Sequence, residues 1–535
     1  MKNQNRIAPS HPAHQTTGQP CPTDEQAEAI EAFLTGRHMR LTALAGTGKT
    51  TTLEMLAQAA DGQGQYLAYN KAIADHAKSR MPGTCKAATC HSLALKGLPK
   101  DLRGSSNDKL FNSASVPMIA QTLPLTEQLA LPALGGQIVI EPQLMAGLIR
   151  QTVAGFLHSA ENQPEMAHAN HVVGQYTRLA HALPSSRAEL ASLTVHLARK
   201  LWGRMRDRTD PMPLGFDGYL KAWALTEPKI KADYILLDEA QDTNPVLASI
   251  IQRHAKQGLA QVVSVGDPYQ QIYGWRGAIN AMESLPSEVE GCLTQSFRFG
   301  PVIAQVANQL LDPLGAAQQM TGSGRTPGSV HPVCADQTPD LSDLDAVLCR
   351  TNIGLVKHLL LAQLAERQTA VFEQSATELE RLLRDVQGLQ SGRPAQSSEL
   401  AGFKDWSDVV EISREPHGLE LATLVSLVQT YTVAGLQDVL AQCHRLREHA
   451  GRPICELLVT TTHKAKGCEW DSVWIAPDFD RPEREVEQDG QKTTEFDPEA
   501  GRLLYVAATR ARQTLFIPDW MAEPATGSAQ HAERQ

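Results

Sequence analysis

Residues 39–60 read MRLTALAGTGKTTTLEMLAQAA, and this order predicts a strand, a glycine loop and a helix. Gly46 and Gly48 allow backbone N–H groups to curl around phosphates, Lys49 reaches their β and γ oxygens, and the Thr50 hydroxyl ligates Mg²⁺. Ala43 replaces the first glycine of the general pattern. The stretch therefore predicts a phosphate-binding loop in an α/β fold, with a plain glycine turn before a helix as the alternative.

A phosphate-binding loop needs an acidic partner on a neighbouring strand. The apolar run from Tyr234 to Leu237 ends in Asp238 and Glu239. Asp238 is placed to hold Mg²⁺, and Glu239 is placed to polarise a water for attack on a γ-phosphate. Acids after an apolar run also occur as helix caps, but the glycine loop upstream favours the catalytic interpretation.

The stretch GDPYQQIYGWRGAI, residues 266–279, combines two glutamines, three aromatics and an arginine. Amides and an arginine suit phosphate, whereas aromatic rings suit flat ligands such as bases. Two further polar groups suit a phosphate backbone but are equally typical of caps and turns: Asn70 with Lys71, and Thr89 with His91 and Ser92. A basic helix face is either a DNA-facing surface or, at least as readily, a solvated face: Arg199, Lys200, Arg204, Arg206 and Arg208.

Composition limits the class of protein. The 535 residues are 42% hydrophobic with a net charge of −10, and no apolar run approaches the roughly 18 residues of a membrane span. Nine cysteines include no Cys-x-x-Cys pair, and Cys85, Cys90 and His91 lack a second pair of zinc ligands. Free thiols favour a reducing cytoplasm. Negative net charge does not exclude nucleic acid, because binding needs only a local basic channel.

Nine motifs together resemble one family. In chain order, over roughly residues 23 to 518, they are PTDEQAEAI, ALAGTGKTTT, AYNKAIADHAK, ATCHSLA, LLDEAQD, VGDPYQQIYGWRGA, LTQSFRFG, TTTHKAKGCEWDSV and LLYVAATRARQ. This order resembles superfamily 1 helicases of the UvrD/Rep/PcrA type. Within that group the pattern is most similar to the helicase region of the F-box DNA helicase.

The resemblance implies an α/β fold with two RecA-like P-loop motor domains, each built on a parallel sheet and interrupted by a mostly helical insertion. We expect residues 23–93 and 230–290 in the first domain, with insertion 94–229. Residues 291–355 and 453–518 form the second domain, with insertion 356–452, which is compact for this family. Residues 1–22 and 519–535 are expected to be tails, disordered at both ends of the chain.

The resemblance also assigns roles at an ATP site. Gln26 reads adenine, Phe297 stacks on it, and Glu469 touches the ribose. Arg298 and Arg510 contact the γ-phosphate from the second domain, and Gln270 senses it. The phosphate cradle comprises Ala45, Gly46, Thr47, Gly48, Lys49, Thr50 and Thr51, and the Mg²⁺ ligands are Thr50 and Asp238.

A DNA strand is expected along both domains. Trp275 is the stacking platform of that track, and Lys466 lies near the strand or the interdomain cleft. The expected contacts are Asn70, Lys71, Thr89, His91, Tyr273, Trp275, Thr462 and His463.

The resulting expectation is a cytoplasmic ATP-dependent helicase or translocase. It uses ATP and Mg²⁺, moves 3′ to 5′ on single-stranded DNA and tailed duplex DNA, serves repair, recombination or replication, and involves no membrane. Its protein partners are not predicted. The alternative is a DNA-stimulated ATPase that displaces proteins or acts as a switch in a defence system without productive unwinding. A structural protein with an inactive site is disfavoured by the intact Lys49, Asp238, Glu239 and Arg510.

Overall fold

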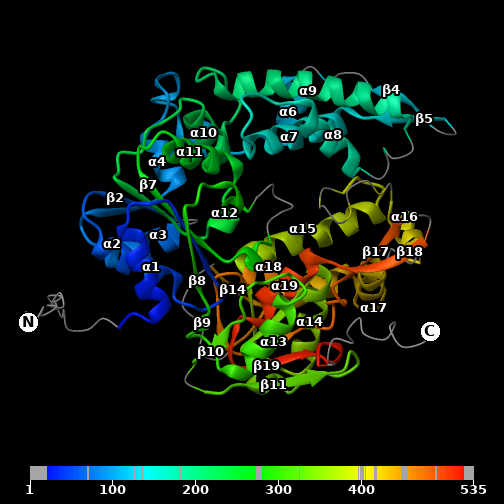
Figure 1. The fold of residues 1–535 in the computed structure, drawn as a ribbon. Helices are drawn as coiled ribbons and strands as arrows, with labels where there is room; N and C mark the ends of the chain where they lie inside the picture. The colour runs from blue at the N-terminus through cyan, green and yellow to red at the C-terminus, as the bar shows by residue number, and fades with distance from the viewer. Residues whose placement is uncertain are drawn as a thin grey trace, which may run out of the picture.

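The computed structural model of the chain describes residues 21–522, apart from short internal gaps at 69–70, 124, 126–127, 134–135, 177–178, 180–181, 273–279, 325, 396, 398–399, 401–402, 404, 415–418, 448–455 and 489–490. Nearly all of both expected tails lies outside the described residues. The chain forms two bodies, each centred on a β-sheet with helices beside it (Figure 1). Both bodies are assembled from segments that are far apart in the sequence.

The first domain is built on a six-stranded, wholly parallel sheet in the order β3-β2-β6-β7-β1-β8. Helices cover both faces of such a sheet, so its inner strands β2, β6 and β7 are almost completely buried. The strands are β1 (Met39–Ala43), β2 (Gly64–Ala68), β3 (Cys85–Thr89), β6 (Tyr234–Leu237), β7 (Gln261–Gly266) and β8 (Val289–Leu293). The accompanying helices are α1 (Asp24–Leu34), α2 (Lys49–Ala59), α3 (Lys71–Arg80), α4 (Cys90–Lys96), α11 (Pro245–Lys256) and α12 (Ala281–Ser284).

The second domain has a seven-stranded parallel sheet in the order β11-β19-β16-β12-β15-β13-β14. Its strands are β11 (Ser329–Val333), β12 (Ala346–Cys349), β13 (Thr369–Phe372), β14 (His444–Leu446), β15 (Leu457–Thr461), β16 (Trp470–Ile475) and β19 (Ala511–Pro518). Its helices are α13 (Pro301–Leu311), α14 (Asn352–Leu364), α18 (Thr462–Ala465) and α19 (Pro498–Ala508), and the short strands β9 (Gln295–Ser296) and β10 (Thr321–Gly322) pair beside it. The predicted α/β fold with two parallel sheets is confirmed.

The first insertion lies between α4 and β6, at the top of Figure 1. It is mostly helical: α5 (Asn107–Phe111), α6 (Val116–Thr122), α7 (Pro142–Leu157), α8 (Met166–Gln175), α9 (Pro184–Arg206) and α10 (Gly215–Ala224). It also contains an antiparallel hairpin of β4 (Leu129–Ala133) and β5 (Gly136–Ile140), which the sequence did not predict.

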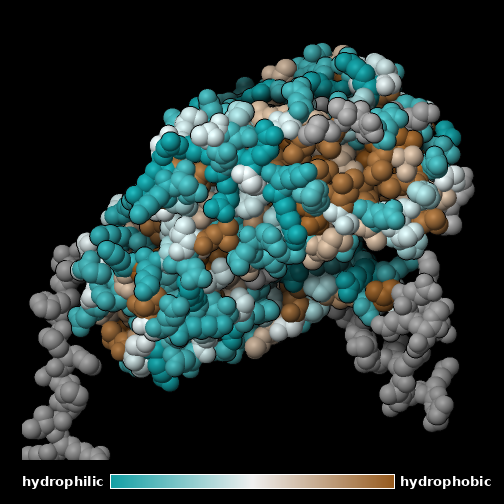
Figure 2. All heavy atoms as spheres, turned by 90° about the horizontal axis from the view of Figure 1, so that it is seen from above, coloured by the Kyte–Doolittle hydropathy of each residue, from teal (hydrophilic) through white to brown (hydrophobic). Residues whose placement is uncertain are grey.

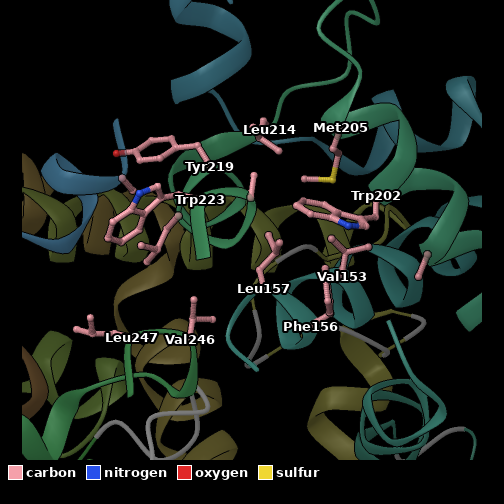
Figure 3. Close-up of a cluster of buried hydrophobic side chains, with 14 of the residues drawn as sticks. Val153, Phe156, Leu157, Trp202, Met205, Leu214, Tyr219, Trp223, Val246 and Leu247 are labelled. Carbon is pink, nitrogen blue, oxygen red and sulfur yellow. The ribbon is translucent and has the colours of Figure 1, made fainter. Parts of the chain in front are cut away.

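A continuous hydrophobic core joins this insertion to the first domain. Phe156 of α7 and Trp202 of α9 pack edge to face with ring centroids 5.2 Å apart. The same cluster continues through Trp223 of α10 to Val246 and Leu247 of α11 (Figure 3). The insertion and the first domain therefore share one buried core.

The second insertion comprises α15 (Glu373–Gln390), α16 (Trp406–Ile412) and α17 (Leu419–Gln442). The strands before and after it, β13 and β14, pair with each other in parallel at the edge of the second sheet. Sequence analysis placed both strands inside the insertion, whereas the sheet includes them. A separate ribbon of β17 (Glu483–Gln488) and β18 (Gln491–Phe496) follows β16.

One face of the molecule is mainly polar. Figure 2 shows the molecule from above, where hydrophilic residues cover most of the face and hydrophobic residues gather in one area toward the right. Among the described residues, no helix combines the length and apolar character needed to cross a membrane.

Candidate active site

The phosphate-binding loop leaves the end of β1 and enters α2. Gly46 and Gly48 have φ of 75° and 81°, a left-handed conformation that glycine adopts without steric cost. Lys49 Nζ donates to the Ala43 carbonyl at 3.1 Å, so its ammonium lies folded over the loop. Thr47 is buried and its hydroxyl donates to the Leu44 carbonyl at 2.8 Å, whereas Thr50 and Thr51 remain partly exposed on the first turn of α2. Position 46 also has no room for a side chain, because a Cβ there would lie 2.7 Å from Arg298 Cβ.

The acidic pair follows β6 at the same edge of the sheet. Asp238 is 3% exposed and accepts two hydrogen bonds, from Glu239 N at 2.9 Å and from the Tyr66 hydroxyl. Burial, with the Glu239 charge adding to it, raises the pKa of Asp238 to about 6. Burial also acts to raise the pKa of Glu239, but the positive charges of Lys49 and Lys466 outweigh it and hold that pKa below its usual value.

Glu239 has a strained backbone conformation, with φ of 51° in a non-glycine residue. Gln241 Nε2 donates to its Oε2 at 2.6 Å and also to Asp242 Oδ2 at 3.1 Å. The carboxylate is thus held in a fixed direction beside Lys49, which suits a group that orients and deprotonates water.

Two arginines of the second domain reach this edge. The Phe297 amide donates to the Gly46 carbonyl at 2.9 Å, which lays the segment carrying Arg298 across the loop. Arg298 Nε donates to Glu469 Oε2 at 2.6 Å, and its Nη1 donates to the Thr509 carbonyl at 2.8 Å. Glu469 is therefore an ion-pair partner of Arg298 in this conformation.

Arg510 is almost completely buried, with 1% of its surface exposed. Its Nε and Nη1 donate to the carbonyls of Val506 and Cys468, at 2.9 and 3.2 Å, while Nη2 donates to Gln270 Oε1 at 3.0 Å. Burial and the nearby charge of Arg298 lower the pKa of Arg510 to about 9. The expected γ-phosphate sensor of the first domain and the expected arginine finger of the second are directly hydrogen-bonded.

A second cross-domain contact lies beside this pair. Lys466 Nζ, after α18, donates to the carboxylate of Asp242 and to the Gln270 carbonyl, the latter at 2.6 Å. Burial raises the pKa of Asp242 to about 6, although the Lys466 charge opposes the shift. Lys466 therefore lies in the interdomain cleft, one of the two places that the resemblance implies.

Sequence reasoning did not single out four residues of this network. They lie within the motifs LLDEAQD, VGDPYQQIYGWRGA and LLYVAATRARQ, so the motifs themselves carried the signal: Gln241, Asp242, Asp267 and Tyr505. Tyr66 was also missed, because an apolar strand position gives no indication of the carboxylate that its hydroxyl meets.

The adenine candidates lie on either side of Gly48. A Cβ at Gly48 would lie 3.5 Å from Gln26 Nε2 and 3.8 Å from the Phe297 ring. Gln26 is 4% exposed and already closes the cap of α1: its Oε1 accepts from Thr23 N at 3.1 Å, and its Nε2 donates to Thr52 Oγ1 at 3.0 Å. Phe297 is 50% exposed, which suits a ring that stacks on a flat ligand.

The described DNA candidates lie on α3, at the start of α4 and on α18. Lys71 is exposed at the start of α3, and His463 is partly exposed on α18. Thr89 caps α4 by accepting from Ser92 N at 3.2 Å, and Thr462 is fully buried, which keeps its hydroxyl from the surface in this conformation. The expected residues Asn70, Tyr273 and Trp275 lie outside the described residues.

His91 faces the first insertion. Its Nε2 lies 3.5 Å from Asp217 Oδ1, and its ring meets the edge of Tyr219 with centroids 5.8 Å apart. Four arginines of the basic face at α9 have partners within the chain, three of them carboxylates, which favours the solvated-face interpretation. Its contacts are Arg199 with Glu165, Arg204 with Asp210, Arg206 with Asp101, and Arg208 with the Arg103 carbonyl.

Comparison with known proteins gives two family matches. Residues 22–286 match the UvrD/REP helicase N-terminal domain, and residues 171–519 match the UvrD-like helicase C-terminal domain. F-box DNA helicase protein 1 of Schizosaccharomyces pombe is 30% identical over 93% of this chain and 57% of its own length. F-box DNA helicase 1 of Gallus gallus is 27% identical over 90% of this chain and 47% of its own. The chain thus spans about half the length of these relatives.

Proposed function

The chain belongs to the UvrD-like helicase family, and from this premise we propose that it is an ATP-driven motor that moves along single-stranded DNA. The observation that carries the proposal is the hydrogen bond between Gln270 and Arg510, beside the Lys49 loop and the Asp238–Glu239 pair. It joins a group of the first domain that is suited to sensing a γ-phosphate to a group of the second domain that is suited to stabilising its charge. Hydrolysis at such a site changes the contact between the domains, which is what a stepping motor requires.

The residues present fit Mg²⁺ and a nucleoside triphosphate. The left-handed glycines turn the loop into a cradle, and Lys49 and the partly exposed Thr50 lie at its helical end. Thr50 and Asp238 supply oxygen donors, the kind that Mg²⁺ prefers. Exposed Phe297 and buried Gln26 border Gly48, where a stacking ring and an amide suit a purine. When bound, Mg²⁺ neutralises charge on the phosphate oxygens.

Each remaining catalytic step is assigned to a side chain. Glu239 orients and deprotonates the attacking water. Arg298 and Arg510 stabilise the charge that develops on the transferred phosphoryl group, and Gln270 relays its state toward the loop 273–279. The family resemblance assigns the aromatic residues of that loop to the DNA bases, a 3′-to-5′ direction to the motor, and repair, recombination or replication to its task.

The test is an ATPase assay with and without a single-stranded oligonucleotide, beside strand displacement on 3′-tailed and 5′-tailed duplexes. We expect hydrolysis that single-stranded DNA stimulates, and unwinding of the 3′-tailed duplex alone. Lys49→Ala should abolish turnover, whereas Glu239→Gln should still bind ATP, because only the water-activating carboxylate is lost. DNA-stimulated ATPase without displacement of either duplex would favour a protein-displacing or switching ATPase. Hydrolysis that DNA leaves unchanged would refute the motor.

A further inference from the structure

The Tyr505 hydroxyl makes hydrogen bonds across the interface between the two domains. It lies on α19 of the second domain and is fully buried. The hydroxyl accepts a hydrogen bond from Ala45 N in the phosphate-binding loop at 3.1 Å. It also donates to Asp267 Oδ2 at 3.1 Å. One side chain of the second domain therefore contacts two segments of the first domain that hold phosphate-directed groups, the glycine loop and the segment that carries Gln270.

Asp267 connects this hydroxyl to the sensor. Its Oδ2 also accepts from Gln270 Nε2 at 2.7 Å, and Gln270 Oε1 in turn accepts from Arg510 Nη2 at 3.0 Å. The chain of hydrogen bonds therefore runs from the Ala45 amide through Tyr505, Asp267 and Gln270 to Arg510. Gln270 and Asp267 are 5% and 0% exposed, so water does not substitute readily for a lost partner.

We propose that Tyr505 is a positioning residue that couples the phosphate-binding loop to the Gln270–Arg510 pair across the interdomain cleft. The proposal deepens the motor function above and rests on it. Tyr505 lies in the last turn of α19, and Arg510 follows that helix by two residues with its Nε bonded to the Val506 carbonyl, so a shift of the loop against the phenol is passed to the arginine through the end of the helix. The hydroxyl acts as donor and acceptor at once, a combination that phenylalanine lacks.

The phenol is suited to this task because it stays neutral. Burial, with the Asp267 charge adding to it, raises the pKa of Tyr505 far above its ordinary value. Asp267 also accepts from Tyr269 N at 3.1 Å, so its carboxylate meets three donors and keeps a fixed orientation. Removal of the hydroxyl would leave the buried Ala45 amide without this acceptor and loosen Asp267.

The experiment compares Tyr505→Phe, Gln270→Ala and the double variant in steady-state ATPase assays with a saturating oligonucleotide. Tyr176→Phe is the matched control, because it loses one hydroxyl contact, the bond from Gln151 Nε2 at 3.0 Å, inside the first insertion. We expect Tyr505→Phe to lower kcat about tenfold, equivalent to about 1.4 kcal/mol, with less than about a twofold change in KM for ATP. In the Gln270→Ala background, Tyr505→Phe should lower kcat by less than about a further twofold, because both residues act through one connected network of hydrogen bonds.

Hydrogen exchange of the nucleotide-free protein gives a readout that does not depend on turnover. Peptides covering 44–48 and 266–272 should exchange faster in Tyr505→Phe than in wild type and in Tyr176→Phe. A further tenfold loss of kcat in the double variant relative to Gln270→Ala, an unchanged kcat in Tyr505→Phe, or unchanged exchange would overturn the coupling role. If wild type shows no DNA-stimulated ATPase, the proposed function fails, while the exchange result still decides the coupling. If Tyr505→Phe does not fold, Asp267→Asn must give the same exchange pattern or the inference is wrong.

Discussion

At the scale of single residues, Asp238 is held from two directions. Each of its carboxylate oxygens accepts one hydrogen bond, from Glu239 N and from the Tyr66 hydroxyl. We predict that Tyr66→Phe raises the Mg²⁺ concentration for half-maximal ATPase about tenfold, because groups that orient a metal ligand typically contribute 10- to 100-fold in metal affinity. At saturating Mg²⁺ the kcat should stay within about threefold of wild type. A Mg²⁺ titration of the ATPase checks this, and an unchanged half-maximal concentration would reduce Tyr66 to a packing residue.

A second prediction concerns the buried Arg510. Arg510→Ala should lower kcat by about 10³-fold or more, as expected for an arginine finger, while weakening nucleotide binding by less than about tenfold. Arg512→Ala is the control, because Arg512 is partly exposed and pairs with Asp471 at 2.7 Å on the surface. Turnover and binding of a fluorescent nucleotide measure the two effects. If only affinity changes in Arg510→Ala, the residue is a ground-state contact or a structural residue.

At the scale of elements, α10 is attached to α7 through a buried lysine. Lys221 is 2% exposed, and its Nζ donates to the Ser159 carbonyl at 2.7 Å and lies 4.5 Å from the centroid of the Phe156 ring. Burial lowers the pKa of Lys221 to about 8. Between pH 8 and the unfolded value near 10.5, the unfolded chain therefore binds more protons than the folded protein, and stability rises with pH in that window.

We therefore predict that wild type gains stability relative to Lys221→Met as the pH rises from 8 to 10.5, by up to about 3 kcal/mol. Urea unfolding of both proteins at pH 7.5 and pH 10 measures the difference, and the variant cancels the titration of all other groups. A stability difference that does not change with pH would mean that Lys221 is solvated in the folded protein.

Elements with strong local patterns were predictable, and elements defined by partners were not. The glycines, Lys49 and the apolar run before Asp238 carry their conformation locally, so the loop and β6 were expected where the structure has them. The hairpin β4–β5 and the strand β14 were missed. Each strand is only three to five residues long. The short apolar runs of β4 and β5 do not distinguish strand from helix before their neighbours are known, and β14, His444–Leu446, has no apolar pattern at all.

At the scale of the whole molecule, Lys466 joins the two domains through Asp242 and the Gln270 carbonyl. We predict that Lys466→Met lowers kcat/KM for ATP by about 30-fold or more, because removing one partner of a buried charge pair typically costs at least about 2 kcal/mol. The radius of gyration of the nucleotide-free protein, measured by small-angle X-ray scattering, should increase as the domains separate.

Lys464→Met is the matched control for this prediction. Lys464 lies on α18, two residues before Lys466, but its partner Glu378, at 2.7 Å, belongs to α15 on the side of the second domain. Lys464→Met should change kcat/KM for ATP by less than about threefold and leave the radius of gyration unchanged. Equal effects of the two substitutions would show that α18 is merely destabilised in both.

The nine motifs identified the family correctly, because each motif is a local string and their order requires no coordinates. The pairing of Arg510 with Gln270, and of Tyr505 with Ala45 and Asp267, was not predictable in this way. These partners lie 238 to 460 positions apart in the chain and meet only when two separate sheets dock. Sequence reasoning therefore named groups that the structure brings together, such as Gln270 and Arg510, but not the contacts between them.

The parallel pairing of β13 with β14 has a practical consequence for measuring domain movement by fluorescence energy transfer. Both ends of the segment containing α15, α16 and α17 are fastened to adjacent strands of one sheet, so the segment has two anchor points and not a single flexible tether. A dye attached to the outer face of α15 would therefore report the position of the whole second sheet. Paired with a dye on α3, it would convert each opening and closing of the cleft into a change of energy-transfer efficiency, readable one molecule at a time.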